Sequence, residues 1–164
     1  MRISRRSAVA VSTAAAFAAC AGAAAPTGLA DRGFFRSVIS PSMPSYPKLH
    51  GSRPGSMPWQ IDRGKSIIRL IRTGEATGEL EVRVAGLIIP EVGTRGQVTS
   101  VDASLYCAHD QRPVETTELV PLSKRGMATI EEPVELPVLC LDPAVLIHPL
   151  GNTTIYIASS GWVF

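Results

Sequence analysis

Apolar and polar residues alternate along much of the chain after residue 58, with the period of two that is typical of β-strands. The clearest run is Glu79–Ile89, in which one side carries Leu80, Val82 and Val84 and the other carries Glu79, Glu81 and Arg83. Gly86 breaks this phase, which predicts a bulge. Turn-forming residues separate the runs, as at Thr73–Gly78 and Ser123–Gly126. The pattern therefore predicts strand after strand, joined by short turns.

A second alternating run, Gly96–Asp110, brings a cysteine to the apolar side of its strand. Val101, Ala103, Leu105 and Cys107 fall on alternate positions, with Asp102 and Ser104 between them. Cys140 lies in another apolar, strand-like run. We predict that Cys107 and Cys140 form a disulfide, which would close a loop of roughly 34 residues. Two separate buried thiols are the alternative.

About seven strands without a long helix predict an all-β fold, because two sheets can bury their apolar faces against each other. We expect an antiparallel β-sandwich with immunoglobulin-like architecture over residues 58–164. Trp59 precedes both cysteines rather than lying between them, so the likeness to immunoglobulin domains is architectural only. Glu132 stands on the apolar side of its strand, which predicts either a bulge at Pro133 or a place at the rim of the core.

Residues 1–30 have the parts of a signal peptide. Arg2, Arg5 and Arg6 precede an alanine-rich apolar run, and small residues follow it. The run is short and poor in large apolar residues for a spanning helix, so we expect export without a transmembrane span after processing. The two alternatives for export are the general route and the twin-arginine route. We expect the signal peptide to be cleaved after Ala30. The alternative is a lipid anchor at Cys20, which ends a stretch similar to a bacterial lipobox.

Residues 31–57 are rich in proline, serine and glycine, which predicts a disordered linker. Phe34–Phe35 and Val38–Ile39 are apolar exceptions, and the alternative is that this segment docks on the domain.

The charge of the chain argues against nucleic-acid binding. The whole sequence has 16 lysines and arginines and 14 aspartates and glutamates. Three of those arginines and none of the acids precede Asp31, so the remainder has 13 cations against 14 acids, a net charge of −1. A nearly neutral chain without a lysine or arginine cluster lacks the basic patch of a nucleic-acid binder.

Candidate catalytic or metal-binding residues are few. His109 precedes Asp110 in a loop, and His148 ends a strand before Pro149. Either histidine would need to meet an acid in a cleft to act in a hydrolytic or metal-dependent enzyme. The common catalytic, zinc-binding and phosphate-binding motifs are lacking from the sequence. We therefore assign no catalytic residue, no metal ligand and no cofactor.

Aromatic residues are the remaining candidates for a binding site, because an exposed flat ring stacks on sugars or inserts into partners. The candidates are Trp59, Tyr106, Tyr156 and Trp162. If they cluster on one face, they favour a carbohydrate or envelope-ligand binding domain. The alternative for Trp59 and Trp162 is that they close the core at the first and last strands.

Several short stretches together resemble small uncharacterised secreted proteins of high-GC Gram-positive (actinobacterial) bacteria. The stretches are Pro58–Trp59, Ser104–Cys107, Leu136–Pro137 with Cys140, Ile147–Pro149, Gly151–Thr153, Tyr156–Ala158 and Ser160–Trp162. The resemblance implies export, the cysteine pairing and the β fold, and supplies no catalytic residue. We expect an exported, non-enzymatic interaction or structural protein at or outside the cell surface, with a protein or cell-envelope ligand as its partner.

Overall fold

The protein is all-β in a computed structural model that describes residues 34–73, 75–108, 110–137 and 139–161. None of these residues lies in a helix. The strands are β1 (Phe34–Pro41), β2 (Arg53–Pro54), β3 (Arg63–Thr73), β4 (Glu75–Ala85), β5 (Ser100–Tyr106), β6 (Glu115–Thr116), β7 (Val120–Pro121), β8 (Ala128–Glu135), β9 (Ala144–Pro149), β10 (Ile155–Tyr156) and β11 (Ala158–Ser160).

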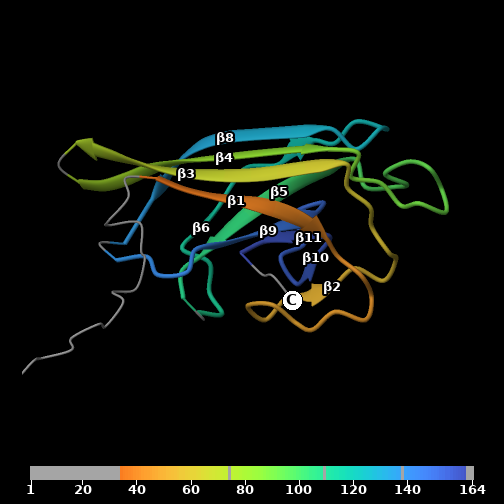
Figure 1. Ribbon diagram of the computed structural model, residues 1–164, viewed down its shortest axis with the longest axis horizontal. Helices are drawn as coiled ribbons and strands as arrows, with labels where there is room; N and C mark the ends of the chain where they lie inside the picture. The colour runs from red at the N-terminus through yellow and green to blue at the C-terminus, as the bar shows by residue number, and fades with distance from the viewer. Residues whose placement is uncertain (1–33, 74, 109, 138, 162–164) are drawn as a thin grey trace, which may run out of the picture.

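One long antiparallel sheet makes both layers of the sandwich. Its strands are hydrogen-bonded in the order β6-β5-β9-β11-β1-β3-β4-β8, and β7 also pairs with β5. β1 joins the layers, because Phe34–Val38 pair with β3 whereas Ile39–Pro41 pair with β11. Figure 1 shows β3, β4 and β8 as one layer and β5, β9 and β11 as the other. The predicted antiparallel β-sandwich is confirmed, and it is nearly closed into a barrel.

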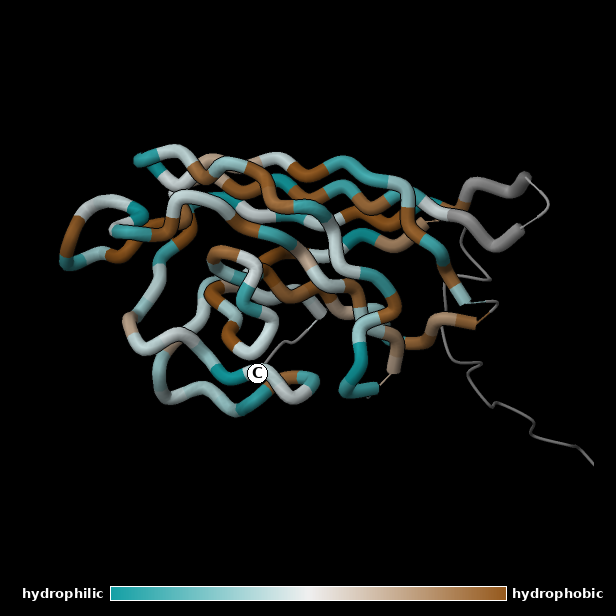
Figure 2. Tube along the Cα trace, turned by 180° about the vertical axis from the view of Figure 1, so that it is seen from behind, coloured by the Kyte–Doolittle hydropathy of each residue, from teal (hydrophilic) through white to brown (hydrophobic). Residues whose placement is uncertain are grey.

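The core between the layers is built by the alternation seen in the sequence. Leu80, Val82 and Val84 point inward from β4, and Val101, Ala103, Leu105 and Cys107 point inward from β5 and its end. Figure 2 shows hydrophobic and hydrophilic positions alternating along the strands. Glu132 keeps its inward register without a bulge, and its carboxylate accepts hydrogen bonds from the Glu118 backbone N–H at 3.2 and 3.1 Å. Of the two alternatives for Glu132, the rim is therefore correct.

The outer face of β5 and β9 is also covered, which the alternation did not indicate. Asp102, Ser104 and Tyr106 are buried on this side of β5, as are Leu146 and His148 on β9. The cover consists of residues 42–57 and 150–157, with β2 and β10 pairing in parallel within it (Figure 1). We call these two stretches the cover segments. They explain why a strand with polar residues on one side is buried on both.

The predicted disordered linker at residues 31–57 is wrong from Phe34 onward. β1 pairs with β3 and β11, and the backbone of Ser42 bonds to that of both Ile157 and Trp59. The physical reason is the apolar content among the prolines: Ile39 and Leu49 are buried, whereas Pro41 and Pro54 end strands and Pro44 lies in a turn. The alternative that this segment docks on the domain is the correct one. The predicted signal peptide lies outside the described residues, and none of the described residues forms a helix long and apolar enough to cross a membrane.

Candidate functional site

Cys107 and Cys140 form the predicted disulfide, with their Cα atoms 4.9 Å apart. Cys107 directly follows β5, and Cys140 lies in the loop that leads to β9. The backbone N–H of Ala108 donates to the Leu141 carbonyl at 2.6 Å, so the two connections are also hydrogen-bonded beside the disulfide. The bond thus joins two neighbouring strand ends and closes the loop that contains β6, β7 and β8.

The predicted cluster of exposed aromatic rings is not formed by the three candidates that the structure describes. Trp59, Tyr106 and Tyr156 are all buried. Trp59 packs in the main core, whereas Tyr106 and Tyr156 pack with Leu49 and Leu146 beneath the cover segments. Each of the three rings is covered by loop segments that the alternation of polar and apolar residues alone would place in solvent. Trp162 lies outside the described residues.

The two tyrosines hold the cover segments in place. The Tyr156 hydroxyl donates to the Pro47 carbonyl at 2.8 Å, and burial, with a smaller effect of Tyr46, raises the pKa of Tyr156 to about 12. Tyr106 stacks on His50, with the ring centroids 4.3 Å apart. Burial also raises the pKa of Tyr106, against hydrogen bonds with Ser52 and Ser104 that lower it. These rings anchor the cover instead of offering a stacking surface.

His148 does meet an acid, but in the interior. It is the cross-strand neighbour of Asp102, and their exposed fractions are 0% and 2%. His148 Nδ1 donates to the Ile155 carbonyl at 2.6 Å, and the Gly151 N–H donates to the Asp102 carboxylate at 3.1 Å. Each side chain therefore joins the sheet to the second cover segment. An enzyme based on His148 requires this pair to face a cleft, and the structure instead encloses it; His109 lies outside the described residues.

Burial shifts the pKa values of His148 and Asp102 in opposite directions. It lowers the pKa of His148, opposed by the bond to Ile155 and by the charge of Asp102. Burial raises the pKa of Asp102, opposed by His148 and by the Gly151 N–H. Both shifts favour the neutral forms. His148 Nε2 is buried without a hydrogen-bond partner among the described residues, so protonation there would add a buried N–H that no acceptor meets.

Replacing His148 by asparagine is expected to change how stability depends on pH. The lowered pKa means that the unfolded chain binds the proton first, so His148 contributes stability that is lost as the pH falls below about 6.5. Asp102 contributes the opposite slope above about 3.8, and it remains in H148N, where the opposing effect of His148 on its pKa is absent. Asparagine keeps a donor for the Ile155 carbonyl but does not titrate. Urea unfolding from pH 7 to 5 should show native protein losing up to about 1.4 kcal/mol per pH unit more than H148N; parallel curves would contradict this.

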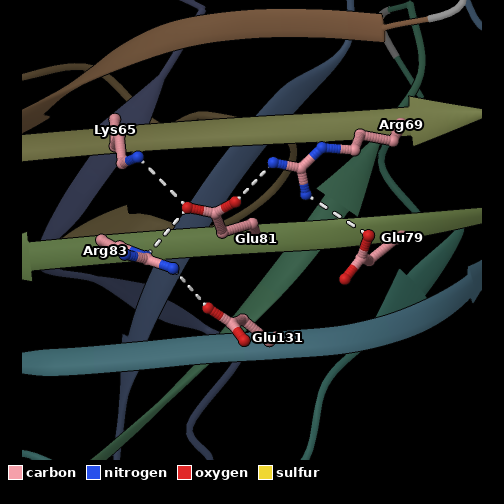
Figure 3. A network of polar contacts seen from close by, with 6 residues as sticks. All are labelled: Lys65, Arg69, Glu79, Glu81, Arg83 and Glu131. Atoms are coloured by element: carbon pink, nitrogen blue, oxygen red, sulfur yellow. Dashed lines mark hydrogen bonds and ion pairs between the residues drawn. The ribbon is translucent and has the colours of Figure 1, made fainter.

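A charged network covers the outer side of the other layer. Figure 3 shows Glu81 at its centre, on β4. One Glu81 oxygen contacts Lys65 Nζ at 3.2 Å and Arg83 Nε at 2.8 Å, and the other contacts Arg69 at 2.7 Å. Arg69 also pairs with Glu79 and Arg83 with Glu131, so the network spans β3, β4 and β8.

Glu81 is unusual for a charged residue on an outer sheet face, because its side chain is only 6% exposed. The hydrogen bond from Arg69 lowers the pKa of Glu81, and Lys65 and Arg83 act in the same direction against the effect of burial. Ile67, directly opposite Glu81 in the register, shares this outer side and is also buried. The aliphatic parts of the neighbouring long side chains therefore cover both residues. The charged groups are held in a defined arrangement.

Exposed apolar residues lie beside this network on β1. Phe34 is 54% exposed and pairs with Arg69, and Val38 is 73% exposed and pairs with Lys65. We call the outward side chains of β1, β3, β4 and β8 the outer charged face. At one end of it a hollow of about 420 Å³ is lined by Arg63, Gly64, Lys65, Arg83, Val84, Ala85 and Thr129.

No family model matches the chain, and neither does any curated protein or solved structure. The resemblance to secreted actinobacterial proteins thus stays an expectation from the sequence. Among the described residues, no three histidine, cysteine or acidic side chains are grouped to hold a metal ion.

The spacing of charged residues in the sequence is a signal for the outer charged face, and predicting the strands alone does not use it. Arg63, Lys65, Ile67 and Arg69 recur every second residue, as do Glu79, Glu81 and Arg83. Opposed in a hairpin, these rows place acids against bases. Their pairing depends on the register, and the structure pairs Thr73 with Glu75 and Arg69 with Glu79, so the strands extend into the stretch Thr73–Gly78 that was predicted as a turn.

Proposed function

We propose that the protein is an exported, non-enzymatic interaction module that contacts a cell-envelope partner through the outer charged face. The observation that carries this proposal is the exposure of Phe34 and Val38 beside a fixed charged network. Exposed apolar side chains rimmed by polar groups are a common composition for interaction surfaces. Because the charges are already paired and positioned, a partner would lose little of its binding energy in ordering them.

The disulfide supports a location outside the cytoplasm. Disulfides form and persist in oxidising compartments and are rare in the cytosol. The bond between Cys107 and Cys140 agrees with the signal peptide expected at residues 1–30. A lipid anchor at Cys20 stays the alternative to release, and either form would present the domain outside the membrane.

Replacement of both exposed apolar residues on the face tests the proposal. We expect the Phe34→Ser, Val38→Ser double variant to retain less than about one-fifth of the envelope material that native protein captures, since two apolar contacts would be lost. A matched control is the Val92→Ser, Leu119→Ser double variant, because these residues are 56% and 50% exposed but lie outside the face. The measurement is capture from a washed envelope fraction. Equal loss in both variants, or no loss in the first, would contradict the proposal.

A further inference from the structure

The hollow at the end of the outer charged face is basic. Of its seven lining residues, Arg63, Lys65 and Arg83 are cationic, none is acidic, and Thr129 adds a hydroxyl group. Arg63 and Lys65 are two residues apart on β3, and Arg83 is the cross-strand partner of Lys65. Thr129 is the partner of Arg83 on β8, so the four side chains come from three adjacent strands and face the same side. They form a row of hydrogen-bond donors around one space.

The neighbouring acids do not use up these donors. Lys65 and Arg83 share one oxygen of Glu81, and Arg83 reaches Glu131 with Nη2. These contacts leave Arg83 Nη1 and two of the three Lys65 N–H groups for another acceptor. Within the described part of the chain, Arg63 takes part in no salt bridge, so its charge is uncompensated there.

The charge balance selects the kind of anion. The network of Lys65, Arg69, Arg83, Glu79, Glu81 and Glu131 is neutral, and Arg63 adds one positive charge. A phosphodiester carries one negative charge and offers two free oxygens as acceptors. Guanidinium groups suit such oxygens because they donate in a fixed planar fork. The volume of about 420 Å³ is large enough for the phosphate together with the groups that it links.

We propose that this hollow binds a phosphodiester group of a soluble, anionic envelope polymer, with Arg63, Lys65 and Arg83 as the phosphate-binding residues. The inference rests on the proposed function and names its ligand class. A polymer strand fits better than an anionic bilayer, because Glu135 lies outside the neutral network on the same outer side of β8 as Thr129 and would repel a flat anionic surface. Val38, exposed next to Lys65 in the register, provides an apolar contact for the linking groups.

Titration calorimetry with three probes tests the ligand class. The probes are poly(glycerol phosphate), poly-glutamate of similar length, and phosphatidylglycerol vesicles, each added to purified protein expressed from the full chain. We expect poly(glycerol phosphate) to bind at least about tenfold more tightly than poly-glutamate, and its binding to weaken with added salt. Tighter binding of vesicles or of poly-glutamate would overturn the inference.

Two charge-matched variants test the location. Arg63→Gln should weaken poly(glycerol phosphate) binding about tenfold, the effect of one lost charge-assisted hydrogen bond. Arg112→Gln removes the same charge from an exposed loop outside the hollow, and it should change the affinity by less than about twofold. The side chain of Arg63 is exposed, so both variants should unfold at the same denaturant concentration as native protein. Equal weakening by the two variants, or none by either, would overturn the site.

Failure of this inference is distinguishable from failure of the proposed function. If no phosphodiester probe binds but the Phe34→Ser, Val38→Ser variant still loses its envelope capture, the ligand class is wrong and the interaction face stands. If that variant captures envelope material as native protein does, the face itself is wrong.

Discussion

Replacement of Cys107 and Cys140 by alanine will lower the free energy of unfolding by about 3–4 kcal/mol, a large share of the 5–15 kcal/mol typical of a domain. The two residues are 33 positions apart, and the bond between them closes the loop that contains β6, β7 and β8. Without it the unfolded chain gains the entropy of that loop, whereas β6 and β7 are held to β5 by only two residue pairs each. Urea unfolding under nonreducing conditions measures the loss.

Native protein in dithiothreitol is the control for this variant. Reduction opens the loop but keeps both sulfur atoms in the core, so it should reproduce most of the loss that the double alanine variant shows. A loss below about 1 kcal/mol in the variant would contradict the role given to the disulfide. If the double alanine variant loses much stability but native protein in dithiothreitol loses none, the effect comes from the packing of the sulfur atoms and not from the closed loop.

Gly126→Ala will lower the free energy of unfolding by about 3–5 kcal/mol. Gly126 ends the turn between β7 and β8 with a φ of +73°, and its carbonyl accepts a hydrogen bond from Leu87 at 3.0 Å. A methyl group at this position would lie 2.3 Å from the backbone nitrogen and oxygen of Leu87. Backbone atoms of a fully buried residue cannot move aside, so the turn must shift and the closure of the sandwich beside β8 must weaken.

Gly93→Ala is the matched control. Gly93 has a φ of +69°, but a methyl group there would meet no atom within 4 Å. Only the strain of the left-handed conformation remains, which costs alanine about 1–2 kcal/mol. Thermal or urea unfolding should therefore show Gly126→Ala to be the less stable variant by about 1–4 kcal/mol. Equal stability of the two variants would show that the contact with Leu87 yields easily.

The inner faces of the sandwich could be predicted from the sequence because alternation is a local signal. Leu80, Val82 and Val84 point inward as their spacing indicates, and Cys107 lies on the inward side of β5 and pairs with Cys140. The turn at Ser123–Gly126 is likewise local and is present as expected. Each of these features depends on residues close together in the chain.

The covered face of β5 and β9 could not be predicted in the same way. Asp102 and His148 are polar residues on alternate positions, which normally indicates a solvent-facing side. They are buried because segments distant in sequence, around residues 42–57 and 150–157, fold over them. The prolines of the first segment suggested disorder, although its Leu49 contacts the sheet through the same buried cluster as Tyr106. A composition rule cannot distinguish a linker from a cover that is rich in turns.

To predict the outer charged face from the sequence, one must also know the register in which β3 pairs with β4. Acids and bases were visible on alternate positions, but their partners are set by where the hairpin turns. With Thr73 paired to Glu75, Arg69 lies opposite Glu79 and diagonal to Glu81. A turn centred further along the chain would have paired different residues and left Glu81 without its three cations.

Hydroxyl-radical footprinting with and without the washed envelope fraction tests the central claim most directly, because it reports which side chains the partner covers. The interaction face proposed for this protein predicts reduced oxidation of Phe34 and Val38, with Val92 and Leu119 unchanged. Reduced oxidation of Val92 and Leu119 while Phe34 and Val38 react as before would contradict it.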